Sequence, residues 1–139
     1  MIDNTQDVID SRDIIERLEE LTAEEEGLIA DIEEADADEE AEAKEALNSW
    51  LEENGDELDI LKELNNDGSN FPDWDCGATL INEDYFEEYC EELCKDIGDI
   101  PSDLPWYIAN HIDWEGVAEE IKQDYGTVEF DGQTFYIRA

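Results

Sequence analysis

Acidic residues outnumber basic ones so heavily in this chain that charge constrains the fold more than any other feature. The 139 residues include 44 Asp and Glu against seven Lys and Arg, so the formal net charge is −37. Self-repulsion of that size destabilises a compact state. Yet 40% of the residues are hydrophobic and 13 are Trp, Tyr or Phe, whereas disordered acidic tails lack such aromatic content. We therefore expect a folded protein with an acidic surface.

The charge extends over the whole chain and limits its partners. Residues 1–70 hold 26 acids and four bases, and residues 71–139 hold 18 acids and three bases. Phosphates would repel such a chain, so we expect no direct binding to nucleic acid or to an anionic membrane, and a partner with a basic face.

No apolar run is long enough to span a membrane and the N-terminus lacks a signal-peptide pattern, which predicts a cytoplasmic protein. The three cysteines are expected to be reduced.

The first half of the chain is predicted to be helical. Apolar residues recur at helical spacing behind a cap at Ser11, and Thr22-Ala23-Glu24-Glu25 fits a capping box at which a new helix would start. Residues 33–46 have only Ala as apolar residues, so this stretch is either a solvent-exposed helix or a mobile link. Asn54-Gly55 is expected to end one helix before a further short one over residues 58–64. Two apolar-striped helices with short connections suggest an antiparallel helical hairpin.

The second half of the chain mixes helices with a β-hairpin. Periodicity predicts helices over residues 82–97 and 113–123, with Trp106 and Trp114 in the core. Apolar and polar residues alternate on both sides of Asp131-Gly132, which is typical of a type I′ hairpin, and this hairpin should pack on the helix that carries Trp114. The chain is thus predicted to be a mostly helical α+β protein. Its expected parts are an acidic helical region, residues 1–66, and an α+β region ending in a β-hairpin, residues 67–139.

Few residues could support catalysis or metal binding. The single histidine, His111, has no Ser or Cys partner at a motif spacing and is expected on the surface or beside a helix. Cys90 and Cys94 lack the spacing of a zinc knuckle, so we predict no metal site. Gly68 could be the turn glycine of a calcium loop, but Trp74 stands where that loop needs a Glu. We therefore expect neither enzymatic activity nor a cofactor.

The carboxylates themselves are the remaining chemical feature. Like charges at i,i+4 cost a helix about a few tenths of a kcal/mol per pair, and ordinary helices offset them with Lys or Arg. Carboxylates four residues apart lie about 6 Å apart along a helix, and DNA carries one charge per about 3.4 Å of each strand, so an acidic helix face can approach the charge density of DNA. We predict a DNA mimic that occupies a basic DNA-binding groove without turnover. The predicted partner-binding acids are Glu33, Glu34, Asp36, Asp38, Glu39, Glu40, Glu42, Glu87, Glu88, Glu91, Glu92, Asp113, Glu115, Glu119, Glu120 and Asp124.

The segment from Leu104 to Tyr125 resembles the C-terminal signature of ArdA-type antirestriction proteins. The likeness is carried by Ile-Asp-Trp-Glu at residues 112–115, then a helix, then Asp-Tyr and a closing strand. This family consists of DNA mimics from phages, plasmids and transposons, usually elongated dimers that occupy the DNA-binding groove of type I restriction–modification enzymes. The resemblance implies an antirestriction protein acting in a host bacterial cell. It also implies an acidic patch supported by Trp114 and Tyr125 and formed by Asp113, Glu115, Glu119, Glu120 and Asp124.

The first half of the chain does not match that family, which leaves other functions open. A CRISPR effector or another defence complex could be the target instead of a restriction enzyme. An acidic chaperone or adaptor for a basic nucleic-acid-binding protein is the main alternative, and it would bind basic proteins more broadly than a mimic would. A calcium-responsive protein is a further alternative, which the failed loop motif disfavours. A homodimer would suit the mimic, because two copies would lengthen the charged rod.

Overall fold

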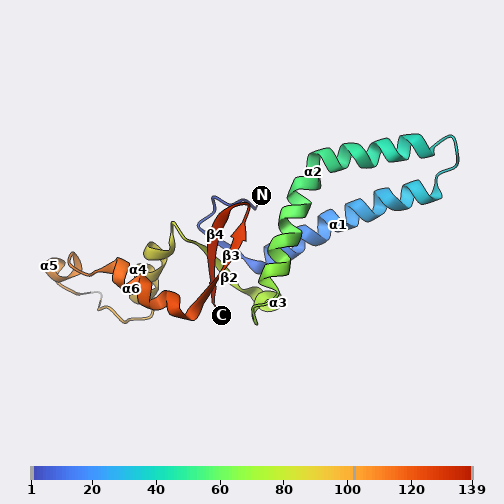
Figure 1. Ribbon diagram of the computed structural model, residues 1–139. Coiled ribbons are helices and arrows are strands. Elements are labelled where there is room, and N and C mark those ends of the chain that lie inside the picture. The colour runs from blue at the N-terminus through green and yellow to red at the C-terminus, as the bar shows by residue number, and fades with distance from the viewer. Residues whose placement is uncertain (1, 102, 139) are drawn as a thin grey trace.

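The computed structural model describes residues 2–101 and 103–138 and shows an elongated α+β protein (Figure 1). A four-stranded antiparallel sheet lies in the middle of the molecule. A long hairpin of two helices extends from one side of the sheet, and a smaller group of helices lies on the other side. The chain is therefore mostly helical with a sheet that ends in a C-terminal β-hairpin, as the sequence predicts.

The sheet has the strand order β1-β2-β4-β3. Its strands are β1 (Val8–Asp10), β2 (Thr79–Asn82), β3 (Tyr125–Phe130) and β4 (Gln133–Arg138). β3 and β4 form the predicted hairpin, and both residues of its turn have positive φ, 50° at Asp131 and 83° at Gly132, as a type I′ turn requires. Periodicity did not predict β1 and β2, because three or four residues are too few to display alternation.

Helix α1 (Ser11–Glu34) begins differently from the prediction. Its cap is Asp10, whose carboxylate accepts a hydrogen bond from the backbone N–H of Arg12 at 2.9 Å, so the cap predicted at Ser11 is wrong by one residue. The buried Ser11 hydroxyl instead donates to the carbonyl oxygen of Trp74 and accepts from the N–H of Ala78, both at 2.7 Å. Ser11 therefore ties α1 to the segment that precedes β2.

The expected interruptions of α1 and α2 are both wrong. α1 passes through Thr22 without a break, and α2 runs unbroken from Glu40 to Gly68 through Asn54-Gly55. Figure 1 shows a bend near the middle of α2, in the part of the helix that contains these two residues. Gly55 has no side chain to stiffen the backbone, and the Asn54 side-chain amide donates to the carbonyl of Trp50 at 3.2 Å, so both loosen the helix locally. The helix continues because leucines beyond the bend are buried, namely Leu58, Leu61 and Leu64.

Together α1 and α2 form one long antiparallel helical hairpin (Figure 1). The two helices expected on either side of Asn54-Gly55 do not form a hairpin with each other, because both belong to α2. The stretch 33–46, left open between a helix and a link, is divided between the two alternatives. Residues 33–34 end α1, residues 35–39 form a turn, and residues 40–46 begin α2. The two helices are therefore joined at the far tip of the molecule by a short, acidic connection.

The helices on the other side of the sheet are shorter than predicted. They are α4 (Phe86–Asp96), α5 (Trp106–Ala109) and α6 (Trp114–Ile121), with a 3₁₀ turn (Lys122–Asp124) after α6 and a short α3 (Trp74–Gly77) before β2. α4 begins four residues later than the predicted start at Asn82, because Asn82 ends β2 and pairs with Phe135 of β4. α6 begins behind Asp113, whose carboxylate accepts from the N–H of Gly116 at 3.0 Å.

Both faces of the sheet are covered. On one face, Leu80, Phe135 and Ile137 pack with leucines of α1 and α2. This core also contains Leu64 and Trp74, so residues from both sides of the boundary expected between residues 66 and 67 contribute to it. The second core holds Ile81, Phe86, Cys90 and Ala118, with Tyr125 and Tyr136 of the hairpin packed against it. The β-hairpin therefore contacts α6, as predicted, with one face, and the helical hairpin with the other.

Candidate partner-binding surface

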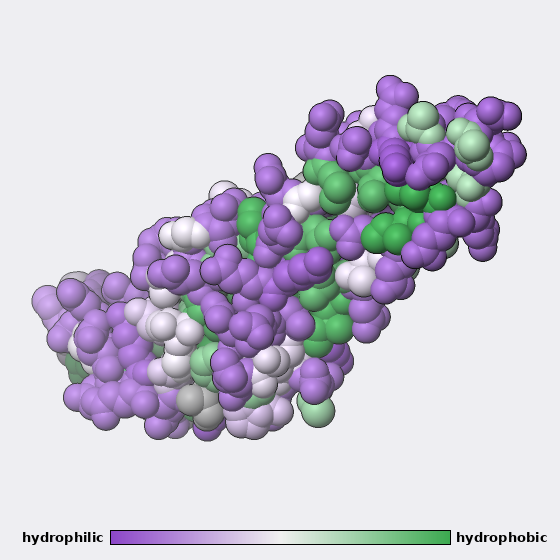
Figure 2. Space-filling model, turned by 45° about the vertical axis from the view of Figure 1, so that its right-hand side comes forward, coloured by the Kyte–Doolittle hydropathy of each residue, from purple (hydrophilic) through white to green (hydrophobic). Residues whose placement is uncertain are grey.

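Most carboxylates of this protein have no cation beside them. In the part of the chain that the structure describes, the ion pairs engage six acids, which leaves 38 of the 44 without a Lys or Arg nitrogen within 4 Å. Figure 2 shows the consequence on one face, where hydrophilic side chains cover most of the surface. The overall negative charge is thus presented to solvent and not neutralised within the fold.

The predicted partner-binding acids fall into two groups at opposite ends of the molecule (Figure 1). We call the first the tip group; its members are exposed and surround the turn between α1 and α2, namely Glu33, Glu34, Asp36, Asp38, Glu39, Glu40 and Glu42. The second, the α4–α6 group, consists of Glu87, Glu88, Glu91, Glu92, Asp113, Glu115, Glu119, Glu120 and Asp124. The structure therefore does not bring all sixteen together into one patch.

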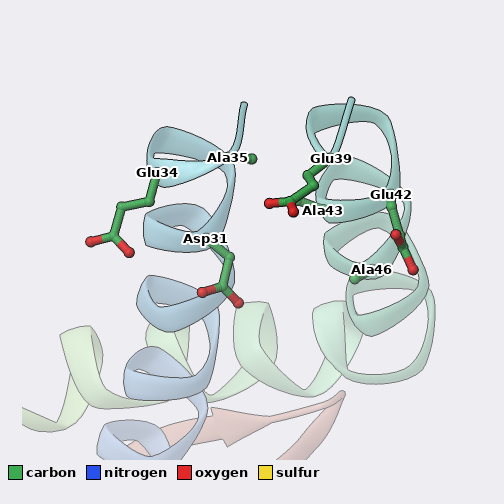
Figure 3. Close-up of a pocket in the computed structure, with 7 residues that line it drawn as sticks. All are labelled: Asp31, Glu34, Ala35, Glu39, Glu42, Ala43 and Ala46. Atoms are coloured by element: carbon green, nitrogen blue, oxygen red, sulfur yellow. The ribbon is translucent and has the colours of Figure 1, made fainter. Parts of the chain in front are cut away.

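In the tip group, carboxylates border a groove between the two helices (Figure 3). Its walls include Asp31 and Glu34 of α1 and Glu42 of α2, with Glu39 just before α2, while Ala35, Ala43 and Ala46 provide small side chains between them. Figure 3 shows Asp31 and Glu39 directed toward the space between the helices, whereas Glu34 and Glu42 point to its outer sides. Carboxylates therefore lie both inside this groove and along its edges.

One acid of the tip group holds the backbone in addition to carrying charge. The Asp36 carboxylate accepts hydrogen bonds from the backbone N–H groups of Asp38 and Glu39, both at 3.0 Å. Its carbonyl oxygen accepts from the N–H groups of Glu39 and Glu40, at 3.2 and 3.0 Å. Asp36 thereby positions the turn from which the other tip acids project.

In the α4–α6 group, some acids converge and others are already engaged. Glu87 and Glu115 lie around a small hollow with Glu119 and Lys122, and the Lys122 ammonium donates to Glu119 at 2.9 Å. That hydrogen bond is the main reason that the pKa of Lys122 is raised, so this lysine stays charged. The convergence of Glu87 and Glu115 across two helices was not evident from spacing along either helix.

Hydrogen bonds hold other acids of this group in place. The Tyr85 hydroxyl donates to the Glu92 carboxylate at 2.7 Å, and this bond raises the pKa of Tyr85 to about 12. Glu91 pairs with Lys95 at 3.1 Å. Three of the sixteen predicted acids are thus ion-paired: Glu40, Glu91 and Glu119.

Some functional candidates were missed at the sequence level. Asp31 lines the tip groove and a second hollow beside Trp50, whose indole N–H donates to Glu24 at 3.1 Å across the hairpin. Arg17 connects the helices closer to the sheet through Glu57, at 2.7 Å, and this hydrogen bond lowers the pKa of Glu57. Helical spacing places residues 24, 28 and 31 on one face of α1, a signal that could have identified Asp31.

An aromatic cluster at the end of the molecule opposite the tip corrects the prediction for Trp106. Its side chain is 74% exposed, with Tyr107 and Ile108 also exposed, so it does not belong to the core. α5 has only four residues and no buried one, which leaves its aromatic side chains without a surface to cover them. Trp114 is half-buried beside an apolar hollow lined by Ile100 and Leu104 among others.

The other candidates for chemistry are distributed as single residues. His111 is exposed in the turn between α5 and α6, as predicted. Cys90 is buried, and burial raises the pKa of its thiol to about 11, which disfavours a nucleophilic thiolate. Cys94 is half-buried and Cys76 is exposed, and neither is in a disulfide. Among the described residues, no group of three or more His, Cys, Asp or Glu is arranged to hold a metal ion.

No protein-family model, no curated protein and no solved structure matches the chain. Within residues 2–101 and 103–138, the helices are too short or too polar to cross a membrane. The resemblance of residues 104–125 to ArdA-type proteins therefore stays a prediction.

Proposed function

We propose that this protein is a DNA mimic that inhibits a bacterial defence nuclease complex by occupying its DNA-binding site, without catalysis. The observation that carries the proposal is the excess of 38 carboxylates that have no neighbouring base in the described part of the chain. Ion-pairing each acid with a Lys or Arg would have stabilised the fold, so retention of so many uncompensated charges points to a partner that supplies the cations.

The charge density of the helical hairpin supports this proposal. Residues 11–68 carry 23 acids and four bases, a net charge of −19. α2 has 29 residues and so a contour length of about 44 Å, which gives one net negative charge per about 2.3 Å. Duplex DNA carries one per about 1.7 Å, so the hairpin has most of the linear charge density of DNA.

The proposed mechanism is competitive occlusion of a basic channel. Long-range attraction would guide the inhibitor to the channel, and short-range carboxylate contacts would take the places of phosphates. A folded chain offers no bases to methylate and no phosphodiester to cleave, so the enzyme would be held without turnover. The separation of the tip group from the α4–α6 group suits a target that contacts an extended stretch of DNA. We expect the protein to act in the cytoplasm of a host bacterial cell.

Type I restriction–modification enzymes are the first target to test, because of the ArdA-like segment; a CRISPR effector or another defence complex is the second. The alternative function is that of an acidic chaperone or adaptor for a basic nucleic-acid-binding protein. The observation that favours the alternative is the division of the acids into two groups, which could hold separate basic segments of one client. A homodimer is compatible with either function.

A competition assay tests the proposal. The protein is titrated into labelled duplex DNA bound to each of a panel of restriction and CRISPR complexes. We expect displacement from one complex at near-stoichiometric protein, with an affinity that falls steeply as salt rises. Binding to free basic proteins without displacement of DNA from any complex would favour the chaperone, and a salt-independent affinity would contradict mimicry.

Two variants of equal net charge test whether mimicry is distributed over the molecule. The tip variant replaces Glu33, Glu34, Asp38, Glu39, Glu40 and Glu42 with the corresponding amides and keeps Asp36, which holds the turn. The matched variant replaces Glu87, Glu88, Glu92, Glu115, Glu120 and Asp124 in the same way. We expect each set to weaken displacement by more than about tenfold, whereas any single Glu→Gln change should cost less than about twofold. Loss of inhibition from one single change would indicate a specific site instead.

A further inference from the structure

The outer half of the helical hairpin lacks a core of its own. Every residue from 22 to 57 is described, and none is fully buried, whereas the inner half buries Leu21, Leu58, Leu61 and Leu64. Six large apolar side chains therefore remain half-buried or exposed in the outer half. We call them the outer stripe: Leu28, Ile29, Ile32, Leu47, Trp50 and Leu51.

The outer stripe is accessible to a binding partner. Ile29 is 40% exposed and Leu51 38% exposed, which places them among the most accessible large apolar side chains outside the aromatic cluster of α5. Figure 2 shows apolar residues gathered in a band along the hairpin and bordered by hydrophilic ones. Leu28 and Trp50 of the stripe line a hollow between the helices together with Gly27, and such a small residue lets another backbone approach closely.

The charge around the stripe determines which occupant fits it. Residues 22–57 hold 16 acids and a single base, Lys44, which is paired with Glu40 at 2.9 Å. In a second copy, the outer half of the hairpin would therefore bring a net charge of −15 against another −15, and every long helix of this chain is similarly acidic. A helix with an apolar face and flanking Lys or Arg would instead be attracted on all sides.

We propose that the outer stripe is a docking site for a basic amphipathic helix of the partner protein. The helix would lay its apolar face on the stripe and place its cations opposite the flanking carboxylates, in the helix-in-groove mode of recognition. This inference rests on the proposed function and deepens it, because many DNA-binding proteins present a basic helix to the groove between two rows of phosphates. Apolar contact would give the protein a preference among basic partners that charge alone does not provide.

A defined peptide serves as the probe. A labelled amphipathic helix of about 20 residues, with Leu on one face and Lys on the other, is compared by fluorescence anisotropy with a peptide in which every Leu is Ser. At low salt both peptides should bind through charge. At about 0.5 M NaCl, where exposed charges are largely screened, we expect only the Leu peptide to retain binding. Equal affinities of the two peptides at both salt concentrations would overturn the proposal.

Matched variants locate the apolar contact. Ile29→Ser with Leu51→Ser should weaken the binding of the Leu peptide by about tenfold or more at high salt, while the methionine counterparts, Ile29→Met with Leu51→Met, should retain it. The control removes two exposed isoleucines at the other end of the molecule, Ile97→Ser with Ile108→Ser. If the control variant loses binding and the stripe variant does not, the apolar site lies around Ile97 and Ile108 and the proposal is wrong.

The same variants separate this inference from the proposed function. A stripe variant that loses peptide binding but still displaces DNA fully would show that mimicry proceeds without the stripe, which would overturn the docking role. A wild-type protein that binds the Leu peptide at high salt but displaces DNA from no complex would retain the docking site and contradict DNA mimicry.

Discussion

Two glycine substitutions should have opposite effects on stability, although both glycines lie in long helices. Gly27 is in the middle of α1, and a Cβ placed there meets no atom within 4 Å. Gly68 is the last residue of α2, and a Cβ placed there would lie 2.4 Å from the Trp74 ring. Helix propensity by itself predicts that alanine stabilises both positions by about 0.5–1 kcal/mol.

The Trp74 ring cannot readily move away from a new side chain at Gly68. It is 2% exposed, its indole N–H donates to Asn65 at 2.8 Å, and its backbone carbonyl accepts from the Ser11 hydroxyl. Inserting a methyl group into a packed core costs about 1–3 kcal/mol. Because the ring is held in place, we take the upper part of this range, about 2–3 kcal/mol, and subtracting a propensity gain of about 1 kcal/mol leaves a net destabilisation of about 1–2 kcal/mol for Gly68→Ala.

Thermal unfolding followed by circular dichroism at fixed salt measures both effects. For a chain of 139 residues, about 1 kcal/mol corresponds to about 3 °C in Tm. Gly68→Ala should therefore lower Tm by about 3–6 °C, and Gly27→Ala should raise it by about 2–3 °C. Combining Gly68→Ala with Trp74→Phe should cost less than the sum of the two single changes, because the smaller ring leaves room for the methyl group. A Gly68→Ala protein that melts at or above the wild-type temperature would refute this account of the packing.

Three other properties can be checked on the purified protein. Raising NaCl from about 20 to about 500 mM should increase Tm, because salt screens the self-repulsion of a net charge of −37; a decrease would mean that the ion pairs outweigh the repulsion. Glu57→Gln should lower Tm, because it removes the ion pair with Arg17. Arg17 lowers the pKa of Glu57 in the folded state, so the difference in Tm between wild type and variant should be full above the ordinary carboxyl pKa of 4.5. That difference should shrink as pH falls below 4.5. A thiol reagent should modify exposed Cys76 in the folded protein but reach buried Cys90, whose pKa is about 11, only on unfolding; equal rates would contradict its burial.

Some features of the site depended on position in space and could not be predicted from local pattern. The exposure of nearly all the predicted acids follows from their charge, because burying an unpaired carboxylate is very costly. The division of these acids into two groups does not follow from their charge, because it depends on the sheet lying between the helical hairpin and the α4–α6 helices. Likewise, Glu87 and Glu115 belong to different helices and meet only because α4 packs on α6.

The sequence by itself determined the features whose energetics are local. Periodic apolar residues predicted helical structure in the segments of α1, α4 and α6 and in most of α2, and Asp131-Gly132 predicted the β-hairpin, because turn conformation depends on those two residues. Tertiary structure decided what depends on distant partners. α2 crosses Asn54-Gly55 because buried leucines beyond that point hold the helix together, and β1 becomes a strand because β2 supplies its hydrogen bonds. Trp106 is exposed because its helix is too short to pack on a neighbour, which no property of the residue itself reveals. Short segments gain their stability from contacts made across the fold, and those contacts cannot be predicted from the residues that neighbour the segment in sequence.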